Sequence, residues 1–157
     1  MQRIDVPAGA SAWAQQRGAL ELSRAWLAGS TFVGVGAVSE ASVTLTDVTI
    51  VDVAASDCGG MPCDPYGGGF GLSAHFGASL RATRFDVRDV ALCGVVVGGD
   101  IGVPTSVDLD TGTIAGAPVG ACVQVDGYDV SRLRRDVQYG DVGLPTQATR
   151  YTLPDAL

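Results

Sequence analysis

Lysine is absent from this chain of 157 residues, and charged residues of both signs are scarce. All ten basic residues are arginine, against 17 acidic residues, which leaves a net charge of −7 at pH 7. Nucleic acids and anionic membranes attract positively charged proteins, so this charge disfavours both as partners. It favours a cationic ligand, such as a divalent ion, or a basic partner.

Long apolar runs are also missing. No run reaches the roughly 18 residues of a transmembrane helix, so we expect no membrane span. The opening sequence MQRIDVPAGA has no apolar core of roughly 7–15 residues, which a signal peptide requires. We therefore expect either a cytosolic protein or a piece of a longer secreted one.

Cysteine is present four times and bears on that choice. Cys58 and Cys63 lie close together in the loop-like sequence SDCGGMPCDPYGGG, which predicts a disulfide, with two free thiols as the alternative. Such a disulfide would place the chain in an oxidising compartment, outside the cell or at its surface. Cys93 falls on an inward position of its strand and Cys122 on an outward one, about three positions out of register. We therefore predict a buried thiol at Cys93 and no bond between these two.

Glycine is abundant, and the chain repeats itself. EASVTLTDVTIVDV (40–53) returns as GASLRATRFDVRDV (77–90), with apolar residues in the same places. A third copy lies at 104–116, a fourth at 126–137 and a weaker first one at 18–29. The copies start 22, 37, 27 and 22 residues apart, and the long interval contains the cysteine loop. We interpret that interval as one ordinary repeat with an inserted loop.

A second type of segment separates the copies. It reads FVGVGAV (32–38), GLSAHFG (71–77), GVVVGGD (94–100) and GACVQVDG (120–127). Apolar residues alternate with small or polar ones, which is the pattern of a strand, and glycines at the edges indicate turns. No window has an apolar stripe with helical period over more than two turns, and the best candidate for a helix is 10–22, as part of a cap.

Short strands with a period of 22–27 residues and recurring turn glycines describe a solenoid. The pattern over 18–142 resembles a right-handed parallel β-helix, the architecture of pectate-lyase-like proteins and of the repeat regions of many secreted bacterial proteins. We predict one all-β domain, 1–157, of about five coils. Residues 1–17 would form an N-terminal cap, with a short helix, and 143–157 a C-terminal cap or tail. The inserted loop would be 54–69.

Stacking the copies predicts the buried rows and the residues that recur at one place. The inward rows would be Val43, Leu80, Val107 and Val130, and, between the copies, Leu72, Val95 and Ala121. Arg81 would stack beside Asp108 as a surface ion pair. Asp52, Asp89 and Asp136 would share one position, which is typical of turn capping and, alternatively, of a carboxylate row that binds calcium.

Few residues suggest chemistry. Asp57, Asp64 and Tyr66 lie on the inserted loop and are the candidate ligand-binding residues, although a tolerated surface insertion is the simpler interpretation. The single histidine, His75, has outward parity and is expected on the surface. No catalytic residue and no metal site is predicted, since the cysteines and His75 lack the paired spacing of zinc ligands. Calcium is the only cofactor that the aspartates suggest.

The expected function is a noncatalytic structural or interaction module, secreted or at the cell surface, or a fragment of one. The alternative is the carbohydrate-binding or carbohydrate-active domain that the resemblance to pectate-lyase-like proteins implies. Its clustered catalytic carboxylates and its Gly-His-Gly sequence are missing here, because the segment around His75 reads AHFG. The candidate partners are a polysaccharide, a protein surface, or a second copy of the chain stacked end to end.

Overall fold

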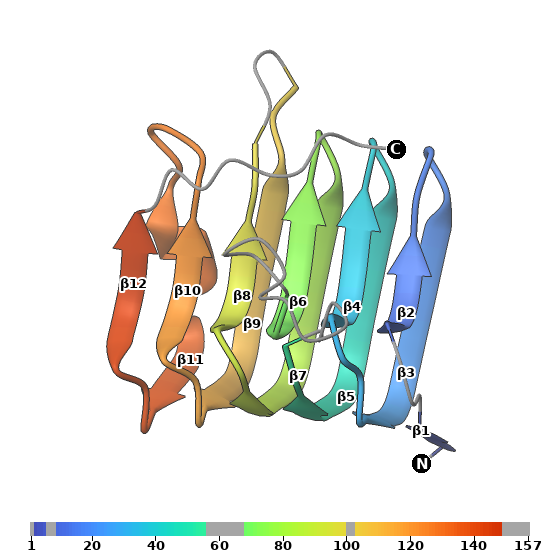
Figure 1. Cartoon of the computed structure of the whole chain (residues 1–157). Coiled ribbons are helices and arrows are strands. Elements are labelled where there is room, and N and C mark those ends of the chain that lie inside the picture. Colours follow the sequence, from blue (N-terminus) through green and yellow to red (C-terminus); the bar gives the residue numbers. More distant parts are fainter. Residues whose placement is uncertain (1, 6–8, 56–67, 100–102, 149–157) are drawn as a thin grey trace, which may run out of the picture.

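Two parallel β-sheets face each other along the whole described chain (Figure 1). The computed structural model of the protein describes residues 2–5, 9–55, 68–99 and 103–148. Sheet A contains, in order, β1 (Gln2–Asp5), β3 (Ala19–Ala28), β5 (Ser42–Val53), β7 (Ser79–Val90), β9 (Ser106–Ala115) and β11 (Arg135–Gly140). Sheet B contains, in order, β2 (Ala10–Ala14), β4 (Val33–Val38), β6 (Phe70–His75), β8 (Cys93–Val97), β10 (Val119–Val123) and β12 (Leu144–Ala148). The chain alternates between the sheets and forms a β-solenoid of about five turns, so the predicted all-β repeat fold is confirmed.

The register of sheet A matches most of the predicted repeat. Val43 pairs with Leu80, which pairs with Val107, and all three are buried. In sheet B, Leu72 pairs with Val95, which pairs with Ala121. These inward rows form one core between the sheets, and deleting such a buried leucine side chain typically costs about 2–5 kcal/mol.

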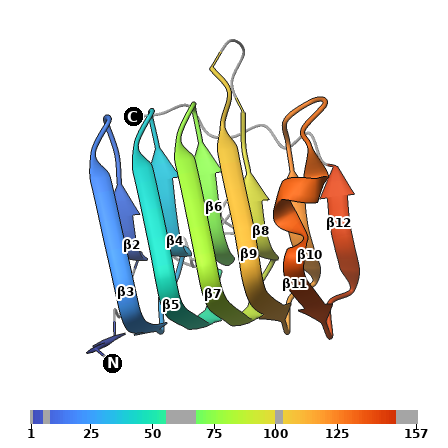
Figure 2. The same ribbon diagram turned by 180° about the vertical axis from the view of Figure 1, so that it is seen from behind.

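The fourth copy was aligned wrongly. Val130 is 38% exposed and begins a short 3-10 helix, η1 (Val130–Leu133), in which Leu133 is the buried residue. The helix starts there because the Asp129 side chain accepts a hydrogen bond from the backbone N–H of Ser131, which caps its N-terminus. The strand of this coil, β11, begins only after the helix. Figure 2 shows η1 beside β9, where a strand of the next coil would otherwise lie.

The predicted helix at 10–22 is also wrong. Strands β2 and β3 form there instead, joined by a tight turn at Gln16 and Arg17. Both residues are left-handed, with φ of 53° and 63°, and the N–H of Gly18 donates to the carbonyl of Gln15 at 2.9 Å. Two consecutive left-handed residues make a type I′ turn, which matches the twist of the strands it joins.

The same turn recurs one coil later and again in the coil after that. Ser39 and Glu40 have φ of 54° and 62°, and Phe76 and Gly77 have φ of 53° and 75°. The turns therefore stack at one end of sheet B. Periodicity along the segment 10–22 could not separate this turn from a helix, because neither glycine nor asparagine occupies its centre.

Two further rows of left-handed residues bend each coil. The middle bend row divides the long strands of sheet A and consists of Arg24, Asp47, Arg84, Thr111 and Asp136. The corner row follows the ends of these strands and consists of Gly29, Asp52, Asp89, Gly116 and Asp141. Asp52 and Asp89 thus share a position as predicted, but Asp136 belongs to the other row and Asp141 takes its place.

Cys93 and Cys122 form a disulfide, contrary to the prediction of a free thiol, and their Cα atoms are 6.0 Å apart. The prediction assumed a straight strand. Val95 faces the core, and a Cβ on Gly94 would also point inward, onto the side chain of Ile114. Two consecutive inward residues bend the strand, so Cys93 and Val96 both lie on the far side of sheet B. The bend shortens the path between the rows and brings the two sulfurs together.

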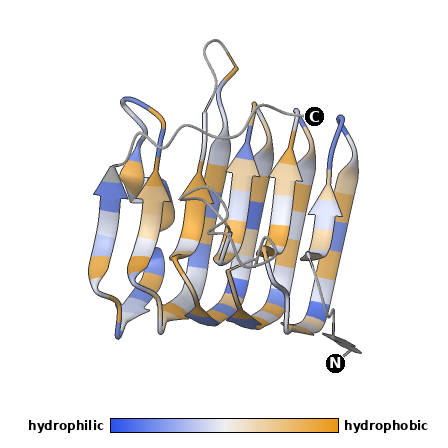
Figure 3. Cartoon of the chain, in the orientation of Figure 1, coloured by the Kyte–Doolittle hydropathy of each residue, from blue (hydrophilic) through white to orange (hydrophobic). Residues whose placement is uncertain are grey.

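That far side carries a second apolar cluster. It contains Val33, Phe70, Cys93, Val96, Val119 and Cys122. Figure 3 shows mainly hydrophobic colouring on β8 and β10 of sheet B, whereas the outer strand β12 carries hydrophilic colouring. A strand with one solvated face would alternate more regularly than β8 and β10 do. Sheet B therefore packs apolar side chains on both of its faces.

Candidate functional site

A shallow depression that is wide open to solvent, called the corner cavity below, lies at the corner of the solenoid, next to the start of the inserted loop. Its volume is about 490 Å³. The lining residues are Asp52, Val53, Ala54, Asp89, Val90, Ala91 and Gly116. They come from three successive coils, because the corner row stacks Asp52 on Asp89 and Asp89 on Gly116.

Gly116 is what leaves room for the carboxylate of Asp89. A Cβ on this glycine would lie 2.6 Å from Asp89 Oδ1, and its φ of 63° already disfavours other residues. The glycine that interrupts the predicted aspartate row is thus part of the cavity. Asp52 and Asp89 themselves are exposed and left-handed, with φ of 57° and 55°. Their backbones are about one strand spacing apart, roughly 4.8 Å.

The chemistry of this cavity is acidic with small apolar walls. Within the described residues, neither carboxylate makes a hydrogen bond or an ion pair with another side chain. The described ranges contain no group of three or more His, Cys, Asp or Glu side chains that could hold a metal. The cavity can therefore offer two acceptor groups to a ligand that carries hydroxyls or positive charge.

The inserted loop starts at this cavity. Ala54 lines it, and Ala55 forms an antiparallel bridge with Gly68, which closes the loop at its base. The predicted ligand-binding residues Asp57, Asp64 and Tyr66, and the predicted disulfide between Cys58 and Cys63, lie outside the described residues. They remain predictions.

His75 is buried, not on the surface as predicted. Its residue is 6% exposed, and burial lowers the pKa of the imidazole to about 4, so it is neutral near pH 7. The predicted outward parity is right, since Ala74 faces the core, but Gly98 of the next coil lets the ring pack over the backbone. Nδ1 has no hydrogen-bond partner among the described groups. The sequence signal for this burial is Gly98, which stacks on His75 one coil away. Alternation within the strand of His75 does not include that glycine.

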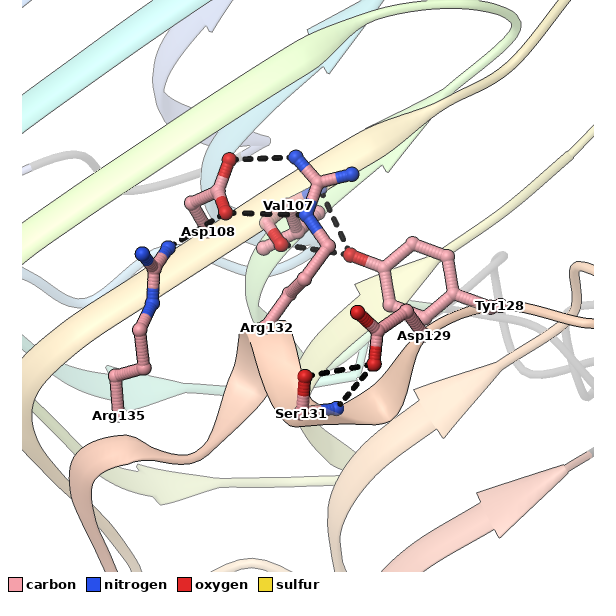
Figure 4. A network of polar contacts seen from close by, with 7 residues as sticks. All are labelled: Val107, Asp108, Tyr128, Asp129, Ser131, Arg132 and Arg135. Carbon is pink, nitrogen blue, oxygen red and sulfur yellow. Dashed lines mark hydrogen bonds and ion pairs between the residues drawn. The ribbon is translucent and has the colours of Figure 1, made fainter.

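A polar network covers part of the other end of the stack, beside β9 (Figure 4). The hydroxyl of Tyr128 donates to the carbonyl of Val107 at 2.6 Å and accepts from the N–H of Val107 at 3.0 Å. One side chain thereby satisfies both backbone groups that a further strand would have paired with. Asp108 accepts two hydrogen bonds from Arg132, at 3.0 and 2.6 Å, and one from Arg135, at 2.6 Å.

The charges in this network support one another. The hydrogen bond from Arg132 lowers the pKa of Asp108, and the same bond raises the pKa of Arg132. Arg81 contributes only through its charge, so the predicted ion pair of Asp108 with Arg81 is replaced by pairs with the two other arginines. The side chain of Asp108 is 18% exposed, so water screens these pairs less than it screens those on the open surface.

Other ion pairs also connect neighbouring coils. Arg84 donates two hydrogen bonds to Asp47, at 2.6 and 3.0 Å, across one coil of the middle bend row. Arg17 reaches Glu40, its equivalent in the next turn, at 3.0 Å. Both pairs are exposed, so each contributes little alone. Each pair joins equivalent positions of two successive coils, so both run along the axis of the stack.

Comparisons with known proteins do not name a family. No protein-family model matches the chain, and neither a curated protein nor a solved structure does so. Nowhere in the described ranges does a helix reach the length and apolarity of a membrane span. The fold and the geometry of these sites are therefore the basis for any functional proposal.

Proposed function

We propose that this chain is a noncatalytic structural or interaction module of the right-handed β-helix type, secreted or at the cell surface. One observation carries the proposal: charged side chains are used to join successive coils. The pairs concerned are Arg17 with Glu40, Arg84 with Asp47, and Arg132 with Asp108. Side chains paired in this way link neighbouring coils, which is a structural role.

The disulfide supports the proposed location. It joins β8 to β10 in successive coils, with both sulfur-bearing residues at most 1% exposed. Disulfides persist in oxidising compartments and are rare in the cytosol of most organisms. A secreted scaffold would use this bond in the same way as the ion pairs, as a link along the axis.

A second candidate function is supported by the corner cavity. Its paired carboxylates, Asp52 and Asp89, could accept hydrogen bonds from sugar hydroxyls, which is the chemistry of a carbohydrate-binding or carbohydrate-active domain of pectate-lyase-like type. The inserted loop beside the cavity would then add specificity.

A turnover assay separates the two proposals. Neutral and acidic polysaccharides, including polygalacturonate, are incubated with the chain, with and without calcium, and new chain ends are measured. The scaffold proposal expects no product above a heat-denatured control. Turnover that disappears in D52N and D89N but persists in the control D86N, whose carboxylate pairs with Arg88 outside the cavity, would overturn it in favour of the alternative. Binding without turnover, lost in the same two variants, would support a binding module at the cavity.

A further inference from the structure

Within the residues that the structure describes, the two ends of the stack are only partly covered. At the N-terminal end, β2 is the last strand of sheet B in the described chain, and β1 pairs only with Ala25–Ala28 of β3. At the C-terminal end, β12 and β11 are the last described strands of their sheets. Ala10 and Leu144 start the same row, so β2 and β12 could pair in register across two molecules. Pro145 removes one amide donor from this edge.

The charges at the two ends are complementary. The middle bend row begins with Arg24 and ends with Asp136, and within it Asp47 and Arg84 already pair one coil apart. Continuing the row into a second molecule would place Arg24 of one copy beside Asp136 of the other. The contact between two copies would thus repeat the pairing of Asp47 with Arg84 that is seen within one chain.

A second row of sheet A also brings opposite charges close together at the contact between two copies. It runs from Glu21 through Thr44 and Arg81 to Asp108. The next place in this row is taken by η1, because β11 begins opposite Asp110, but the side chain of Arg135 reaches back to Asp108 and is 53% exposed. In a head-to-tail stack, Glu21 of the second copy would lie over η1 and approach the guanidinium of Arg135 from the side.

From these rows we propose that the end of the stack formed by β2 and β3 is an interaction surface for a second copy of this chain, bound head to tail. In this orientation Arg24 meets Asp136 in register, and Glu21 comes near Arg135. Two N-terminal ends facing each other would bring Arg24 near Arg24, which is unfavourable. A head-to-tail contact does not close on itself, so it extends into linear stacks.

Strand β1 controls access to this surface. The register carries Ala25–Ala28 through β5, β7 and β9 to 137–140 of β11. β1 therefore occupies the edge where β11 of a second copy would pair. With β1 in place the chain is monomeric, and releasing β1 opens the surface.

The test uses the full-length chain with both Arg3 and Ile4 replaced by proline. Since alternate amides of a strand face its neighbour, one of the two substitutions removes a hydrogen bond between β1 and β3. Sedimentation velocity over a concentration series at low salt should give linear oligomers for R3P/I4P and a monomer for the wild type. Association should weaken by tenfold or more in 1 M salt, where the screening length is about 3 Å.

Charge variants show whether the proposed joint is the one that forms. Adding D136R to R3P/I4P should abolish the stacks, and adding R24D as well should restore them. The matched control is D141R, because Asp141 is also left-handed at the same end but lies in the row of Gly29, which carries no charge. Far-ultraviolet circular dichroism checks that each variant is folded. A monomeric R3P/I4P, equal association of the wild type, or equal effects of D136R and D141R would overturn the proposal.

Discussion

The buried imidazole of His75 should make stability depend on pH in a window that belongs to this residue. Its pKa is lowered from 6.5 to about 4 by burial, so the unfolded chain binds this proton more tightly than the folded one. Stability is therefore complete above about pH 6.5 and is lost as the pH falls toward 4. The full shift corresponds to roughly 3 kcal/mol, since one pKa unit is worth about 1.4 kcal/mol.

Other groups with resolved shifts titrate outside this window. The pKa values of Asp47, Asp108 and Asp129 are lowered from 3.8, so their contributions are lost at more acidic pH. Arg17, Arg84 and Arg132 have raised pKa values and stay protonated throughout. Among the described groups with resolved shifts, only His75 titrates between pH 4 and 6.5, so we expect it to produce their main change in stability there.

Denaturant unfolding at several pH values measures the effect, with H75Q as the matched variant. The wild type should lose up to about 1.4 kcal/mol per pH unit below pH 6 relative to H75Q, which has no titrating group there. The chain contains one histidine, so its proton resonance gives the pKa directly. A measured pKa near 6.5, or equal pH slopes for both proteins, would refute the burial argument.

Three further predictions concern the stack itself. Reducing the Cys93–Cys122 bond, which spans 29 residues, should lower the free energy of unfolding by roughly 3–4 kcal/mol in denaturant titrations, and C93A/C122A should lose its response to reductant. G94A should lower the free energy of unfolding by about 2 kcal/mol or more, because the new Cβ would lie 2.7 Å from the carbonyl oxygen of Gly120. G140A should be nearly neutral, because its new Cβ would meet nothing within 4 Å. Equal effects of the two variants would contradict the proposed bend at Gly94. Calcium should leave the melting temperature of the wild type unchanged, because the described cavity offers only two carboxylates; a rise that D89N removes would reveal a site.

The repeat could be predicted from the sequence where the strands are regular. Val43, Leu80 and Val107 keep the same place because each coil must bury an apolar residue against its neighbours. The prediction failed where a residue outside the pattern changes the path of the chain. At the fourth copy, Tyr128 pairs with the backbone of Val107 and η1 replaces a strand, which apolar alternation cannot indicate.

The candidate site was predicted less well, for two physical reasons. The disulfide depends on a bend at Gly94, and a bend changes which residues face the same side. The corner cavity depends on Gly116, which in the sequence looked like a break in an aspartate row. Both features depend on how neighbouring coils stack. The pattern of residues within a single strand carries no information about that stacking.

The central claim is that charged side chains tie successive coils together, and a double-mutant cycle on Asp108 and Arg132 tests it most directly. D108N, R132Q and the double variant are compared with the wild type by denaturant unfolding at pH 7. Because the side chain of Asp108 is only 18% exposed, we predict a favourable coupling free energy of about 1 kcal/mol. A coupling indistinguishable from zero would mean that the pair does not hold the coils, and would contradict the scaffold proposal.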